Sequence, residues 1–128
     1  SLLKEPKVYF FDTGLVQGGE GLKLENFTAV SLLKHAYALE DYQAKSCSLH
    51  YLRTKERKEV DFALVMNDKI MEMIEVKLSS SDLSASLLYF HQKYGIPAVQ
   101  LVQHLRVEQV KEGCRIVKAQ NYLEDLYL

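Results

Sequence analysis

Three charged side chains lie within two segments whose composition is otherwise typical of apolar β-strands. Asp61 falls in residues 60–66, and Glu75 and Lys77 fall in residues 70–78. Carboxylates and an ammonium group inside apolar strands are costly unless they are paired or bound to a metal. Mg²⁺ is commonly held by one or two carboxylates together with waters and substrate phosphates. The pattern therefore predicts a Mg²⁺ or Mn²⁺ site at Asp61 and Glu75, with Lys77 placed to hold an attacking water or the developing charge on a phosphate.

This site requires a particular register between the two strands. Glu75 and Lys77 share a strand face about 7 Å apart. Asp61 lies opposite Glu75, on the same face, only if an odd number of residues joins the strands or one strand carries a bulge. We expect the three-residue loop 67–69. A two-residue turn without a bulge would place Asp61 opposite Ile74 and turn the two acids apart.

Two further oxygen ligands are candidates for the same metal. Glu25 falls on the core-facing stripe of a helix predicted from Leu22 to about Glu40, and would reach the site if that helix packs on the sheet. The alternatives are a solvated glutamate and a first-turn carboxylate favoured by the helix dipole. The second candidate is the backbone carbonyl of Val76.

A cluster of cations precedes the first of the two strands. Residues 48–54 alternate like a strand, and a charged turn follows them. A charge run of this kind is ordinarily a solvated turn, but beside the acidic strand ends it could contact the phosphates of a nucleic acid. The candidate nucleic-acid-binding residues are Arg53, Lys55, Arg57 and Lys58.

The remaining elements must build the scaffold for these groups. We expect a second helix from Leu83 to Tyr94, ended by Gly95 and Pro97. The order of elements predicts an α/β sandwich around a central sheet. The other predicted segments are a strand at 7–11, a glycine-rich loop at 17–21, strands at 98–103 and 115–118 separated by a charged segment at 106–113, and a terminal helix at 121–128.

The composition limits the class of protein. The chain has 128 residues, which suits one domain spanning 1–128, and its net charge of −1 argues against a general nucleic-acid coat protein. No apolar stretch is long enough to cross a membrane, and the first residues do not form a signal peptide, so we expect a cytoplasmic protein. The cysteines, Cys47 and Cys114, are expected to be reduced thiols.

Glu25, Asp61 and the Glu75-Val76-Lys77 segment, in that order, resemble the core of PD-(D/E)XK nucleases. More closely, the segments KVYFFDTGL, LENF, YLRTKERKEVDFAL and IEVKLS are similar to a bacterial and archaeal domain of unknown function at the C-terminal end of AAA-type ATPases. The similarity covers roughly residues 6–90. A departure from the PD-(D/E)XK pattern is Val60, which stands where the pattern has proline.

The resemblance implies a restriction-endonuclease-like fold, a three-layer sandwich with a central mixed β-sheet flanked by helices. It also implies that Glu25 is the acid of the first helix, that Asp61 is the metal-binding aspartate, and that Glu75 and Lys77 are catalytic. The function expected is a Mg²⁺- or Mn²⁺-dependent endonuclease acting on DNA and normally fused to an AAA-type ATPase.

Two alternatives to a nuclease stay open. One is a catalytically inactive module of the same fold that binds nucleic acid or a protein partner. The other is a purely structural arrangement in which Lys77 bridges Asp61 and Glu75 and no cation binds. The sequence leaves the oligomeric state open.

Overall fold

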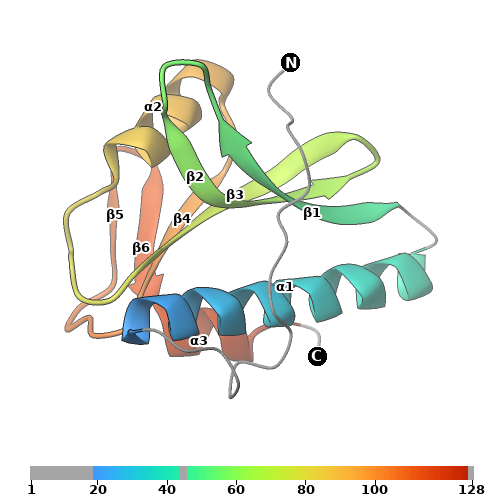
Figure 1. Cartoon of the computed structure of the whole chain (residues 1–128), viewed down its shortest axis with the longest axis horizontal. Helices are drawn as coiled ribbons and strands as arrows, with labels where there is room; N and C mark the ends of the chain where they lie inside the picture. Colours follow the sequence, from blue (N-terminus) through green and yellow to red (C-terminus); the bar gives the residue numbers. More distant parts are fainter. Residues whose placement is uncertain (1–18, 44–45, 127–128) are drawn as a thin grey trace.

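The structure is a computed structural model that describes residues 19–43 and 46–126. Within these residues, three helices surround a six-stranded mixed sheet with the strand order β1-β2-β3-β4-β6-β5 (Figure 1). The elements are α1 (Glu20–Gln43), β1 (Cys47–Arg53), β2 (Glu59–Met66), β3 (Lys69–Lys77), α2 (Ala85–Tyr94), β4 (Ala98–Val102), β5 (Gln109–Lys111), β6 (Cys114–Lys118) and α3 (Ala119–Glu124).

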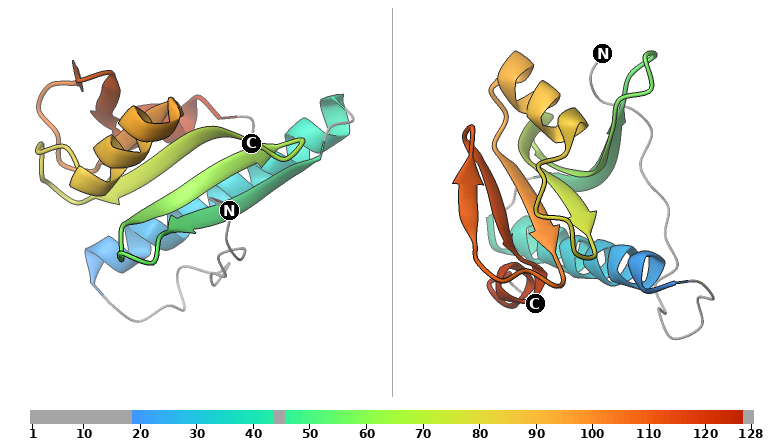
Figure 2. Two further views of the ribbon diagram at one scale, coloured as in Figure 1. Left: turned by 90° about the horizontal axis from the view of Figure 1, so that it is seen from above. Right: turned by 90° about the vertical axis from the view of Figure 1, so that its left-hand side faces the viewer.

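The helices cover both faces of the sheet, so the fold has three layers. α1 and α3 lie on one face and α2 on the other (Figure 2). Successive side chains of the central strand β3 point to opposite faces of the sheet, so Ile74 belongs to the core under α1 and Met73 to the core under α2. The expected mixed α/β sandwich is therefore confirmed at this level. By the same alternation, Glu75 and Lys77 lie on the α2 face.

The hairpin of β2 and β3 has the register that the acid pair requires, although by a different route from the one expected. The connection is a two-residue turn, in which Asn67 and Asp68 have positive φ angles of 51° and 65°. The predicted three-residue loop is therefore wrong. A β-bulge at Met71 restores the register, because Val65 pairs with Ile70 and Leu64 with Glu72.

The predicted helices agree closely with the observed ones. α1 begins two residues before the predicted start, so that Gly21 is helical and not part of a loop. The predicted core-facing stripe of α1 is buried at Ala29, Leu32 and Ala36, whereas Leu22, in the first turn, is exposed. α2 begins after its N-cap, Ser84, and ends at Gly95, whose φ of 67° is the left-handed cap that glycine favours.

Among the described residues, the sheet has one strand more than the sequence predicts. The charged segment 106–113 contains β5, an exposed edge strand that pairs antiparallel with β6. The terminal helix, α3, begins two residues earlier than expected. The strand predicted at 7–11 lies outside the described residues. None of the described helices is both long enough and apolar enough to span a membrane.

Deletion of Met71 should leave the fold and the Asp61–Glu75 pairing intact. Met71 is the residue without a partner, and its side chain is 42% exposed, so its removal gives a regular hairpin with the same faces buried. Deletion of Met73 also gives a hairpin in which Asp61 lies opposite Glu75. However, it moves the charged side chain of Glu72 into the fully buried position that Met73 occupies. We expect thermal denaturation to show a loss of several kcal/mol for the Met73 deletion and about 1 kcal/mol for the Met71 deletion. Equal losses would contradict the assignment of the bulge.

Candidate functional site

Two carboxylates meet where the ladder between β2 and β3 ends. The last backbone pair on this side is Phe62 with Ile74, so Asp61 and Glu75 follow it on the two strands. The backbone N–H of Asp61 donates to Glu75 Oε1 at 2.9 Å, and the backbone N–H of Val76 donates to Asp61 Oδ2 at 2.9 Å. Each carboxylate thus accepts a hydrogen bond from the backbone of the neighbouring strand. The two acids are held together by the strand ends themselves.

The first turn of α2 holds the other oxygen of Glu75. The Ser84 hydroxyl donates to Glu75 Oε2 at 3.1 Å and accepts from the backbone N–H of Leu87 at 3.3 Å. Ser84 is therefore the N-cap of α2 and a partner of the acid at the same time. The Glu75 side chain is only 7% exposed. Hydrogen bonds to both carboxylate oxygens therefore fix the orientation of the Glu75 side chain.

Gln100 fixes the segment that carries Ser84. Its side chain is fully buried on β4, directly beside Glu75 in the parallel β3–β4 ladder. Gln100 Oε1 accepts from the backbone N–H of Ser84 at 2.9 Å, and Gln100 Nε2 donates to the carbonyl of Asp82 at 2.8 Å. Sequence reasoning missed Gln100 and Ser84. The available signal was a single amide in the apolar strand 98–102.

The surroundings of Glu75 disfavour its ionised form. Burial, together with the negative charge of Asp61, raises the pKa of Glu75 to about 7, against a smaller opposing effect of Lys77. Two adjacent carboxylates that resist simultaneous ionisation favour either a shared proton or a bound cation. The pair can therefore act as a ligand set whose affinity for cations rises with pH.

Lys77 lies two residues beyond Glu75 on the same strand face, and is half-buried. No ion pair joins Lys77 to Asp61 or Glu75 within residues 19–43 and 46–126. The alternative in which Lys77 bridges the two acids is therefore not what the structure shows for these residues. The ammonium group is nevertheless close enough to lower the pKa of Glu75.

Glu25 lies on α1, near the end of β3. A Cβ built on Gly21, one helical turn earlier on the same face, would be 3.8 Å from Leu78 Cδ1. The first turns of α1 therefore pass beside the residue that follows Lys77. The described residues contain no group of three or more His, Cys, Asp or Glu side chains arranged to hold a metal ion. The structure brings Asp61 and Glu75 together, whereas α1 packs on the face of the sheet opposite to Glu75 and Lys77. The role of Glu25 as a third ligand stays a prediction.

The cationic turn lies at the start of β2, next to α2. A hydrogen bond from the backbone N–H of Thr54 to the carbonyl of Lys58 closes it, and Arg57 adopts a positive φ of 65°. Lys58 Nζ lies 4.7 Å from the centroid of the Tyr89 ring on α2. The turn that sequence analysis expected is confirmed, and contact with nucleic acid stays a prediction.

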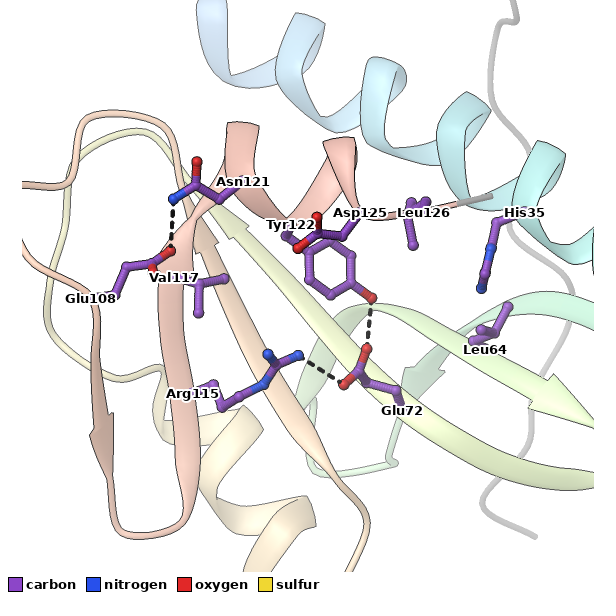
Figure 3. Close-up of a pocket in the computed structure, with 10 residues that line it drawn as sticks. All are labelled: His35, Leu64, Glu72, Glu108, Arg115, Val117, Asn121, Tyr122, Asp125 and Leu126. Carbon is purple, nitrogen blue, oxygen red and sulfur yellow. Dashed lines mark hydrogen bonds and ion pairs between the residues drawn. The ribbon is translucent and has the colours of Figure 1, made fainter. Parts of the chain in front are cut away.

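A separate cavity of about 380 Å³ lies on the opposite face of the sheet (Figure 3). At its centre, Glu72 accepts a hydrogen bond from the Tyr122 hydroxyl at 2.6 Å and lies 3.4 Å from Arg115 Nη2. Burial raises the pKa of Tyr122 and lowers that of His35 at the edge of the cavity, so both are neutral near pH 7. The charge of Glu72 is therefore balanced by Arg115. The cavity shares no residue with the acid pair.

The unfolding free energy should fall as pH rises from about 4.5 to 7. The pKa of Glu75 in the fold, about 7, is above its ordinary value of 4.5, so the folded state binds this proton more tightly than the unfolded state. Glu75→Gln should remove most of this dependence and be more stable than the parent at pH 8 by about 2 kcal/mol. Chemical denaturation across this pH range checks the prediction. The exposed Glu124→Gln is the matched control, and a parent curve that rises through the same range would refute the effect.

Comparison with known proteins gives one match. A family model described as "Domain of unknown function (DUF4143)" matches residues 20–122, a range that contains α1, the acid pair, Lys77 and Gln100. No curated protein and no solved structure matches the chain at a significant level. Because the family model covers most of the sequence, the chain belongs to the DUF4143 family.

Proposed function

We propose that this chain is a divalent-metal-dependent nuclease domain with a restriction-endonuclease-like fold, which hydrolyses phosphodiester bonds in DNA. The observation that carries the proposal is the convergence of the Asp61 and Glu75 carboxylates at the ends of neighbouring strands. Lys77, on the same face as Glu75, supplies a positive charge close to the pair. The likeness to the PD-(D/E)XK core adds that the same residue types occur in the same order.

The residues present fit a hard divalent cation. Asp61 and Glu75 would hold Mg²⁺ or Mn²⁺, with the carbonyl of Val76 and the carboxylate of Glu25 as further oxygen donors. Burial and the charge of Asp61 raise the pKa of Glu75, so the two carboxylates gain from a cation placed between them. When bound, such an ion polarises a phosphoryl oxygen and lowers the pKa of a water molecule.

The chain's own groups would provide orientation and charge. Lys77 would hold the attacking water or stabilise the negative charge that develops on the phosphate. Ser84 would keep the Glu75 carboxylate pointed at the metal, because its hydroxyl holds Oε2. Gln100 would act as a positioning residue, since its buried amide fixes the Asp82–Ser84 segment that carries this hydroxyl.

The proposal includes an AAA-type ATPase as the covalent partner and DNA as the substrate, both from the likeness to C-terminal domains of such ATPases. A catalytically inactive module that binds nucleic acid or a protein is the second candidate. It is favoured by the absence of a three-ligand group among the described residues and by the net charge of −1. In that case DNA or protein binding would survive Asp61→Ala, and calorimetry would detect no metal.

Asp61→Asn, Glu75→Gln and Lys77→Met should each lower metal-dependent DNA cleavage by a factor of about 100 or more, because each removes a charge at the reacting phosphate. Nicking of supercoiled plasmid in Mg²⁺ or Mn²⁺, followed on agarose gels, is the measurement. Lys69→Met is the control, since Lys69 is an exposed lysine at the far end of the same strand. Cleavage that all four variants retain would point to a contaminating nuclease.

Mg²⁺ or Mn²⁺ should also raise the melting temperature of the parent protein, because a ligand that binds only the folded state stabilises it by mass action. The rise should be larger at pH 8 than at pH 6, since protons compete for Glu75. Scanning calorimetry with and without the cation measures it. Loss of the rise in Glu75→Gln, with the rise kept in Glu124→Gln, assigns the site. An equal rise in both variants would place the ion elsewhere.

A further inference from the structure

Two lysines from different elements meet at one tyrosine ring. Lys58, from the turn before β2, places Nζ 4.7 Å from the ring centroid of Tyr89 on α2. Lys93, one helical turn after Tyr89, places Nζ 5.4 Å from the same centroid and donates a hydrogen bond to the Tyr89 hydroxyl at 3.0 Å. Both lysines thus contact the same side chain, Lys58 through a cation–π contact with the ring and Lys93 through a hydrogen bond to the hydroxyl. We call Lys58, Tyr89 and Lys93 the lysine clamp.

The backbone around Lys58 is fixed, so the clamp does not depend on a flexible loop. The Lys58 carbonyl accepts from the backbone N–H of Thr54 at 3.0 Å, and the Lys58 N–H donates to the Thr54 hydroxyl at 3.2 Å. On the other side, Tyr89 packs edge-on against Phe90, which is fully buried. The backbone at Lys58 and the ring of Tyr89 are therefore held in place, which lowers the entropy lost when the clamp binds a ligand.

The clamp and the turn around it carry more cations than carboxylates, in a chain with a net charge of −1. Arg53, Lys55 and Arg57 are exposed on the same turn, together with two carboxylates, Glu56 and Glu59. Hydrogen bonds from its own backbone and from Thr54 hold the pKa of Glu56 below its ordinary value, and the charges of Lys93 and Lys58 add to this effect. The excess of positive charge makes this surface suited to an anionic partner.

The clamp lies on the same side of the sheet as the acid pair. Lys58 precedes Asp61 by three residues, which corresponds to about 10 Å of extended strand. Along α2, Lys93 follows Ser84 by nine residues, which corresponds to about 14 Å of helix. The phosphates of one DNA strand in a duplex are spaced about 3.4 Å apart along the axis, so these distances span roughly three to four nucleotides.

We propose that Lys58 and Lys93, held by Tyr89, bind backbone phosphates of the DNA strand a few nucleotides from the phosphate at Asp61 and Glu75. This inference rests on the proposed function, because it takes DNA as the substrate. The three residues of the clamp present two ammonium groups and one ring, which suit phosphates and carry no paired donors for reading base edges. It would therefore fix the position of the strand without regard to sequence.

Binding of a fluorescein-labelled DNA duplex, measured by anisotropy in EDTA, tests the clamp without cleavage. The double variant Lys58→Ala/Lys93→Ala should bind at least ten-fold more weakly at low salt. Its plot of log affinity against log salt should be less steep than that of the parent by about 2, since each lost phosphate contact removes about 0.9 from the slope. Tyr89→Phe, which loses only the hydrogen bond to Lys93, should show a smaller loss.

The matched control is Lys34→Ala/Lys69→Ala, which removes the same charge from exposed lysines on α1 and at the start of β3. Its affinity should stay within two-fold of the parent, with an unchanged salt slope. Equal weakening in both double variants would mean that only net charge matters, and an unchanged slope in Lys58→Ala/Lys93→Ala would mean that the clamp contacts no phosphate. Either result would refute the proposal that the clamp binds backbone phosphates.

The proposed nuclease activity is tested separately. A parent protein that binds DNA through the clamp but never cuts it in Mg²⁺ or Mn²⁺ would refute hydrolysis alone. A parent that cuts DNA, with the same salt slope in both double variants, would refute the clamp alone. Sequence-independent binding is checked with a second duplex of unrelated sequence, and a difference of ten-fold or more between the two duplexes would contradict backbone recognition.

Discussion

The crossed hydrogen bonds between Asp61 and Glu75 link the two strands where their backbone ladder ends. Each carboxylate accepts from the opposite backbone, so neither acid can turn away without leaving a partly buried N–H without a partner. This constraint also affects the neighbouring segments of the fold. It requires the bulge at Met71, because a regular hairpin with the same two-residue turn and all residues of β3 kept would set the acids on opposite faces. On the other side of Glu75, the N-cap of α2, Ser84, donates a hydrogen bond to Oε2.

Much of this arrangement could be predicted from local patterns. The stripe of apolar residues along α1 and the glycine that ends α2 report local conformation, which depends on neighbours in the sequence. Acids in apolar strands indicated a pairing between Asp61 and Glu75, because an isolated buried carboxylate is too costly to leave alone. The need for an odd loop or a bulge followed from strand geometry. Which of the two occurs did not, since both satisfy the same requirement.

The features that were missed depend on contacts between distant segments. β5 is short and exposed on every residue, so it has no apolar pattern of its own and exists because β6 offers a free edge. Gln100 matters only because β4 lies beside β3, which no local pattern reports. Lys93 resembles any exposed helical lysine until the fold brings it to the tyrosine that Lys58 also contacts. Parallel pairing and tertiary contact thus set the limit of what could be predicted.

The choice of serine at the start of α2 has a consequence for how the helix tolerates changes in proton occupancy. Aspartate and asparagine cap helices as well as serine does. An aspartate at this position would repel an ionised Glu75, and an asparagine would need its amide to turn over whenever the neighbouring acid gained a proton. A hydroxyl both donates and accepts, and rotation about one bond reverses its direction. Ser84 can therefore remain the cap of α2 whether Glu75 is protonated or ionised. A change in the charge of Glu75 thus need not unwind the start of the helix.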